Sequence, residues 1–107
     1  MDSVKFQKLT NGQGLITNLK IGGILVVDYA QYVKKELVDT LANLNEALEI
    51  QICEVDDIDI SFIQLIIAYT KHIAEKGIKF QLKWELEEDQ RLLFENVGLS
   101  YELFMND

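Results

Sequence analysis

The sequence predicts one α/β domain over residues 1–107, with a mixed sheet of four to five strands and about three to four helices. Three observations lead to this prediction: segments that alternate apolar and polar residues, segments with apolar residues at helical spacing, and the order of the two kinds. The glycines lie between the patterned segments, and there is no proline and no Ser-rich linker. A chain of this length buries one core without disulfides.

The first residues predict a β-hairpin. The runs Val4–Leu9 and Leu15–Leu19 have the composition of strands, and residues 11–14, Asn-Gly-Gln-Gly, provide a turn between them. Gly22 and Gly23 are then interpreted as an interruption, because glycines between patterned segments usually mark a break in the chain.

A short apolar run, Ile24–Val27, precedes the first helix. Asp28 is predicted to be its N-cap, with Gln31 three residues later completing a variant of the capping box. The helix is expected to run for about four turns, because apolar residues recur at helical spacing at Ala30, Val33, Leu37, Leu41 and Leu44.

The second half of the chain repeats the order strand, helix, strand, helix. Leu48–Val55 predicts a strand, and Phe62–Lys76 predicts a helix that ends at Gly77. Lys79–Trp84 predicts a strand with one solvent-exposed face. Residues 87–97 predict the last helix, with acids in its first turn and Gly98-Leu99 as its terminator.

Composition narrows the classes of function. The formal net charge is −8, and such a surface repels the phosphates of nucleic acid. No apolar run approaches the roughly 20 residues that cross a bilayer, and no signal peptide is recognisable, so we expect a soluble, cytoplasmic protein. The single cysteine, Cys53, fits a reducing compartment and is predicted to be a buried, unreactive thiol.

The segment 56–67 is the most informative part of the chain. An apolar strand ends in a cluster of acids, and a strongly apolar helix follows without any loop between them. This places the free N–H groups of a helix N-terminus at the rim of a sheet. Ser61 has two interpretations there: an N-cap that forms a Ser-x-x-Gln capping box with Gln64, or a phosphoacceptor.

Other residues of this region have competing interpretations. Asp56, Asp57 and Asp59, with Glu54, are of the type that binds Mg²⁺, but acid pairs are common on so acidic a surface, and no metal or cofactor is predicted. A polar stripe on the second helix is either a contact surface or a solvated face; it consists of Gln64, Ala68, Lys71 and Glu75. The lone His72 has no nucleophile near it in the sequence. Because no acid, base and nucleophile are grouped, we predict a protein that is not an enzyme.

The strand-to-helix junction resembles that of STAS domains, the family of bacterial anti-sigma-factor antagonists. In that family an Asp-Ser-Ser/Thr-Gly-Leu segment carries a phosphorylated serine. Here Asp59 occupies the Asp position, Ile60 the first hydroxyl position, Ser61 the second and Phe62 the glycine position. The resemblance implies that Asp59 caps or braces the junction.

Two further segments follow the family order, so that the resemblance covers nearly the whole chain. Gly23-Ile24-Leu25 resembles the family's Gly-x-Leu entry to the first helix, and residues 94–99, Phe-Glu-Asn-Val-Gly-Leu, resemble the end of its last helix. The resemblance implies a STAS-like fold.

The resemblance also implies a function. The start of the second helix would dock onto a serine kinase or anti-sigma factor of the histidine-kinase ATPase fold, or onto a chemotaxis-type signalling protein. The implied interface residues are Asp59, Ile60, Ser61, Gln64 and Ala68. In the resembled fold the position of Ile60 is exposed, so Ile60 is either a contact anchor or an ordinary surface residue.

Ile60 has no hydroxyl, which departs from the family's phosphoacceptor pattern. The resemblance therefore leaves three roles open: a constitutive antagonist, a protein that is switched through Ser61, or a component of a signalling array such as a chemotaxis cluster. Stand-alone STAS domains also resemble the soluble subunit of bacterial lipid-transport ABC complexes, which is the alternative function.

Overall fold

The computed structural model describes residues 3–96, which form a four-stranded sheet and three α-helices. The elements, in chain order, are β1 (Val4–Thr10), β2 (Ile16–Leu25), α1 (Ala30–Thr40), β3 (Leu44–Ile58), α2 (Ile60–Glu75), β4 (Lys79–Trp84) and α3 (Glu88–Asn96). Two short 3₁₀ turns flank α1, namely η1 (Val27–Tyr29) and η2 (Leu41–Asn43).

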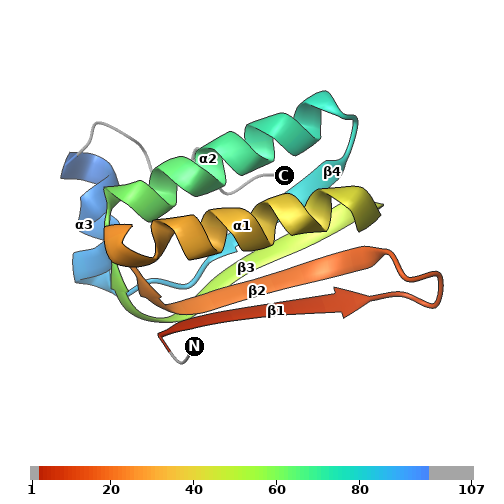
Figure 1. The fold of residues 1–107 in the computed structure, drawn as a ribbon. Helices are drawn as coiled ribbons and strands as arrows, with labels where there is room; N and C mark the ends of the chain where they lie inside the picture. The colour runs from red at the N-terminus through yellow and green to blue at the C-terminus, as the bar shows by residue number, and fades with distance from the viewer. Residues whose placement is uncertain (1–2, 97–107) are drawn as a thin grey trace.

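The sheet is mixed, with the strand order β1-β2-β3-β4. β1 pairs with β2 as an antiparallel hairpin, whereas β2, β3 and β4 are parallel. The helices α1 and α2 lie side by side on one face and run in the same direction, and α3 lies at the end of the sheet where α1 and α2 begin (Figure 1). The predicted α/β class and mixed sheet are confirmed.

The core lies between the sheet and the pair of helices. In the middle of β2 and β3 and in β4, buried residues such as Leu19, Ile50 and Leu82 form the core side of the sheet, while Lys20 and Lys83 beside them are exposed. Trp84 closes one side of the core and meets Phe62 edge to face, with ring centroids 6.4 Å apart. The fully buried side chains include Leu19, Ile21, Val33, Ile50, Ile52, Ile63, Ile66 and Ile73.

The expectation that Gly22 and Gly23 interrupt the chain is wrong, since both lie inside β2. A Cβ on Gly22 would overlap the carbonyl oxygen of Cys53 in β3, and a Cβ on Gly23 would overlap that of Ser3 beside β1. Gly23 also has a φ of +90°, which side chains rarely tolerate. The two glycines therefore allow β2 to lie close to both of its neighbours.

The first helix is shorter than predicted. It ends at Thr40, and β3 already begins at Leu44, which the helical spacing had assigned to the helix. The hydroxyl of Thr40 donates to the Leu37 carbonyl oxygen at 2.6 Å and shares a 2.7 Å hydrogen bond with the hydroxyl of Tyr69 in α2. Thr40 is fully buried, so this tertiary contact anchors the last residue of the helix to α2.

The second helix ends as predicted. Gly77 has a φ of +86°, its N–H donates to the Ala74 carbonyl oxygen at 3.0 Å, and the Ile78 N–H donates to the Ile73 carbonyl oxygen at 3.1 Å. This is a Schellman motif. The third helix begins one residue after Glu87, whose N–H donates to the Gln90 side chain at 3.0 Å. The predicted terminator Gly98-Leu99 lies outside the described residues.

Candidate functional site

The strand-to-helix junction lies at the carboxyl end of the parallel strands. β3 ends at Ile58 and α2 begins at Ile60, so that a single residue, Asp59, connects them. The neighbouring strand β2 ends at Leu25, and the Asp59 N–H donates to the Leu25 carbonyl oxygen at 3.1 Å. The start of α2 and the 3₁₀ turn η1 before α1 therefore occupy the same edge of the molecule (Figure 1).

Asp59 holds this edge together with both of its carboxylate oxygens. One oxygen accepts the Ser61 N–H at 2.9 Å and caps α2, while the other accepts the Val27 N–H, also at 2.9 Å. Val27 is the first residue of η1 and lies 32 positions earlier in the chain. Hydrogen bonds from backbone N–H groups to a carboxylate are stronger than those to a neutral acceptor. Asp59 thus caps one helix and ties it to the turn that starts the other, as the resemblance implied.

The two predicted caps are both wrong for the same reason. Asp28 makes no capping bond, because α1 is preceded by η1 and the first N–H of that turn is already bound to Asp59. Ser61 is the second residue of α2 rather than its N-cap, so no Ser-x-x-Gln box forms with Gln64. The Asp59 carboxylate binds N–H groups at the start of both helical segments, where Asp28 and Ser61 were each expected to act as caps.

The side chains along the start of α2 differ in exposure. Gln64 and Ala68 are exposed, and with the half-buried Ser61 they are neighbours on the helix surface. The whole predicted polar stripe, which continues to Lys71 and Glu75, is exposed.

Ile60 departs from its expected exposure. It is half-buried and packs against the core, so it is not a fully exposed anchor.

Val27 is the exposed apolar side chain of this edge, with 60% of its surface accessible. Sequence reasoning missed it because it ends the short apolar run Ile24–Val27, in which no residue was expected to be exposed more than the others. Its position directly before the polar Asp28 was the only local indication in the sequence that the Val27 side chain is exposed. We call the set Val27, Asp59, Ser61, Gln64 and Ala68 the junction edge.

The junction edge is acidic. Asp28, Asp56 and Asp57 are exposed next to Asp59, and the Asp57 carboxylate accepts the N–H of Ile58 at 2.9 Å. Among the described residues, no group of three acids, histidines or cysteines is placed to hold a metal ion. The acids serve as backbone acceptors and as surface charge, which favours basic groups on whatever covers this edge.

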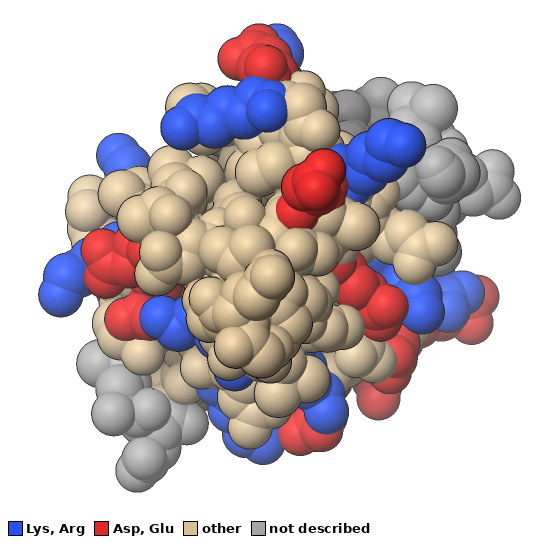
Figure 2. Space-filling view, turned by 90° about the vertical axis from the view of Figure 1, so that its right-hand side faces the viewer, with Lys and Arg blue, Asp and Glu red and all other residues tan. Residues whose placement is uncertain are grey.

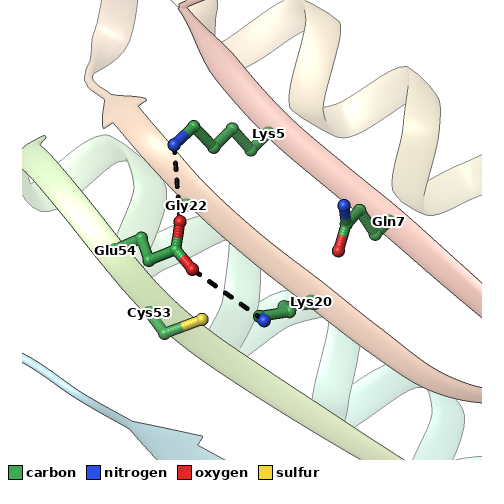
Figure 3. A pocket seen from close by; sticks show the side chains of 6 residues that line it. All are labelled: Lys5, Gln7, Lys20, Gly22, Cys53 and Glu54. Carbon is green, nitrogen blue, oxygen red and sulfur yellow. Dashed lines mark hydrogen bonds and ion pairs between the residues drawn. The ribbon is translucent and has the colours of Figure 1, made fainter.

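A second cluster of polar residues lies on the sheet face opposite the helices. There Glu54 forms ion pairs with Lys5 at 3.4 Å and Lys20 at 3.9 Å, joining three strands above the buried Cys53 (Figure 3). Burial raises the pKa of the Cys53 thiol above its usual value, although the charge of Lys20 opposes the change. The thiol is therefore protonated at neutral pH and a poor nucleophile, in agreement with its predicted role.

The opposite end of the molecule carries the β1–β2 turn. Seen from that end, acidic and basic side chains are mixed around an uncharged central area (Figure 2). The turn is closed by the Asn11 side chain, which accepts the N–H groups of Gln13 at 2.8 Å and Leu15 at 3.1 Å. This end provides control positions that are remote from the junction edge.

Comparison with solved structures identifies the fold. A crystal structure described as an anti-sigma factor antagonist from Mycobacterium paratuberculosis superposes with a TM-score of 0.72, covering 91% of this chain and 80% of that chain at 15% identity. The chain has the fold of an anti-sigma factor antagonist. The STAS-like fold that the junction implied is thereby confirmed, although the two sequences differ at most positions. No protein-family model matches the sequence. No curated protein matches it either.

The STAS-like fold places the matched motif residues together. Gly23-Ile24-Leu25 ends the strand beside the junction, and Asp59 binds just beyond it, so two segments distant in sequence meet at one edge. The third matched segment, residues 94–99, lies partly outside the described residues. In the described part of the chain, no helix is both long and apolar enough to span a bilayer.

Proposed function

We propose that this STAS-like protein is a non-enzymatic signalling component that acts in the bacterial cytoplasm by docking to a protein partner through the junction edge. The proposed partner is a serine kinase or anti-sigma factor of the histidine-kinase ATPase fold. The observation that carries the proposal is the double hydrogen bond of Asp59, which holds exposed Val27 and the first turn of α2, next to exposed Gln64, in one fixed arrangement. A preformed surface of this kind loses little entropy when a partner covers it.

The position of Ser61 suggests how such docking is regulated. Its N–H is bound to the Asp59 carboxylate, and the exposed Asp56 and Asp57 lie close in sequence. A phosphate on the Ser61 hydroxyl would add about two negative charges beside these acids. We propose that the modification, where a kinase carries it out, lowers partner affinity by charge repulsion at the junction edge. Ile60, at the usual acceptor position, has no hydroxyl to modify.

The test compares two arginine variants at opposite ends of the molecule. Gln64→Arg places a bulky cation in the junction edge, whereas Gln13→Arg places it in the β1–β2 turn. Both positions are exposed, so both variants are expected to keep the melting temperature of the unmodified protein. Binding to purified anti-sigma factors and serine kinases of the same organism is measured by calorimetry. Gln64→Arg should weaken binding at least tenfold (about 1.4 kcal/mol), and Gln13→Arg should not.

Two results would contradict the proposal. Equal affinity of both variants would move the interface away from the junction edge. Binding to an ABC ATPase and its permease, with none to kinases or anti-sigma factors, would assign the protein to lipid transport instead. Incubation with a binding kinase and ATP tests Ser61, because phosphate incorporation should disappear in Ser61→Ala.

A further inference from the structure

A groove runs between α1 and α2, beginning where the junction edge ends. Its volume is about 330 Å³, and α1 contributes Leu37 and Val38 while α2 contributes Leu65, Ala68 and Tyr69. Ala68 belongs both to the groove and to the junction edge, so the two surfaces are continuous. The two helices that line it are parallel and lie side by side (Figure 1).

The floor of the groove is apolar. Tyr69 is buried and its hydroxyl is bound to the buried Thr40 at 2.7 Å, so it presents its ring, not its polar group, to the groove. Val38 is 54% exposed in the middle of α1, with the partly buried Leu41 one turn further along the chain. Apolar surface of this kind gains free energy when it is covered, by about 25 cal/mol for each Å².

The polar groups of the groove stand at its two ends. Lys34 lies toward the start of α1, and His72 lies toward the end of α2. No acid is found among the described residues that line the groove, although the chain as a whole carries a net charge of −8. An occupant with an acidic group at the Lys34 end would match this distribution, whereas one with a basic group there would be repelled by Lys34.

The length of the groove fits a short helix. Lys34 and Leu41 are seven residues apart, which corresponds to about 10 Å along a helix axis. A helix with apolar residues at positions i, i+3 or i+4, and i+7 covers the same length with one face. A small apolar ligand fits less well, because pockets for such ligands enclose most of their surface, and here the lining residues Val38, Ala68 and Lys34 are all exposed.

We propose that the groove between α1 and α2 binds an amphipathic helix of the protein partner, with an acidic residue at the end of its apolar face that meets Lys34. The proposal rests on the proposed function only in assigning this helix to the partner that covers the junction edge. The groove itself selects the helix by its apolar floor and by Lys34.

The first experiment uses a synthetic probe and does not require the partner. The probe is a helical peptide of about four turns with leucines at i, i+4 and i+7 and glutamates flanking them; its match carries lysines in place of the glutamates. Titration into isotopically labelled protein should shift the amide resonances of Val38, Ala68 and His72. The lysine peptide should bind roughly fivefold more weakly, and Lys34→Glu should reverse this preference. Shifts confined to other surfaces, or equal binding of both peptides, would overturn the proposal.

The second experiment separates the groove from the junction edge. Val38→Asp places a charge on the exposed floor, and Asp39→Ala, a change at the exposed neighbouring residue outside the groove lining, is the matched control. Val38→Asp should weaken both peptide and partner about tenfold, with the melting temperature unchanged. If Gln64→Arg abolishes partner binding and Val38→Asp does not, the groove proposal fails and the proposed function stands. If the glutamate peptide binds but kinases and anti-sigma factors do not, the proposed function fails and the proposal that the groove binds a helix stands.

Discussion

The Asp59 carboxylate accepts the backbone N–H of Val27 at 2.9 Å, across 32 positions of the chain. With its other oxygen it caps α2 through the Ser61 N–H. The start of the first helical segment and the start of α2 therefore depend on a single side chain. This relationship explains why neither Asp28 nor Ser61 is needed as a cap.

Asp59→Ala should lower the free energy of unfolding by about 2 kcal/mol, because it removes a helix cap and a second charged hydrogen bond. Urea denaturation followed by circular dichroism measures the change. Ser61→Ala is the control and should cost less than about 0.5 kcal/mol, since the Ser61 side chain does not cap the helix. The reverse order of the two costs would restore Ser61 as the cap.

Gly22→Ala should be among the most damaging single substitutions in the sheet, with a loss of about 3 kcal/mol or failure to fold. The added Cβ would overlap the Cys53 carbonyl oxygen, and backbone of a central strand cannot move aside easily. Gly12→Ala, in the open β1–β2 turn, has nothing near its Cβ and should be almost neutral. A stable Gly22→Ala protein would argue against the close approach of β2 and β3.

Tyr69 should make the protein lose stability at alkaline pH. Burial raises the pKa of the phenol above its usual value of 10.0, although the hydrogen bond to Thr40 opposes the change. Because the folded pKa is the higher one, the contribution of Tyr69 to the free energy of unfolding is complete below pH 10. It is lost as the pH rises toward the folded pKa, because the phenol ionises first in the unfolded chain. Denaturation midpoints measured between about pH 9 and 11 should fall more steeply for the unmodified protein than for Tyr69→Phe. Parallel curves would show that Tyr69 ionises as readily in the folded state as in the unfolded chain.

Cys53 should react slowly with iodoacetamide at neutral pH, because the thiol is buried and its pKa is raised by desolvation. We expect alkylation at least about tenfold slower than that of an unstructured cysteine peptide. Guanidinium chloride should remove the difference, and mass spectrometry follows the added group. Rapid alkylation of the folded protein would mean that the strands above Cys53 open readily.

The types and the order of the elements follow from local patterns. Alternation in Lys79–Trp84 and helical spacing in Phe62–Lys76 predict a strand and a helix because both periods are set by the backbone within a few residues. The glycine at position 77 ends its helix by a local conformation, so the sequence located that end as well. The junction residues were identified in the same way, since the acids and the apolar helix are adjacent in the chain.

Apart from Ser61, whose expected capping role belongs to Asp59 two residues before it, the errors concern residues whose role depends on partners distant in sequence. Thr40, the last residue of α1, is anchored by Tyr69 of α2, and Gly22 leaves room for the backbone of β3 beside β2. Neither contact can be predicted from the residues within a short window of sequence. The exposure of Val27 and the half-burial of Ile60 likewise depend on how η1 and α2 meet.

The sequence by itself determined an α/β chain with a STAS-like junction centred on Asp59, because residue periodicity and adjacent motif residues act over short range. Only the tertiary structure decided which N–H groups Asp59 binds, which apolar side chain stays exposed at the junction edge, and that α1 and α2 enclose an apolar groove. These features arise from contacts between segments tens of residues apart, which are fixed when the helices pack on the sheet and not before.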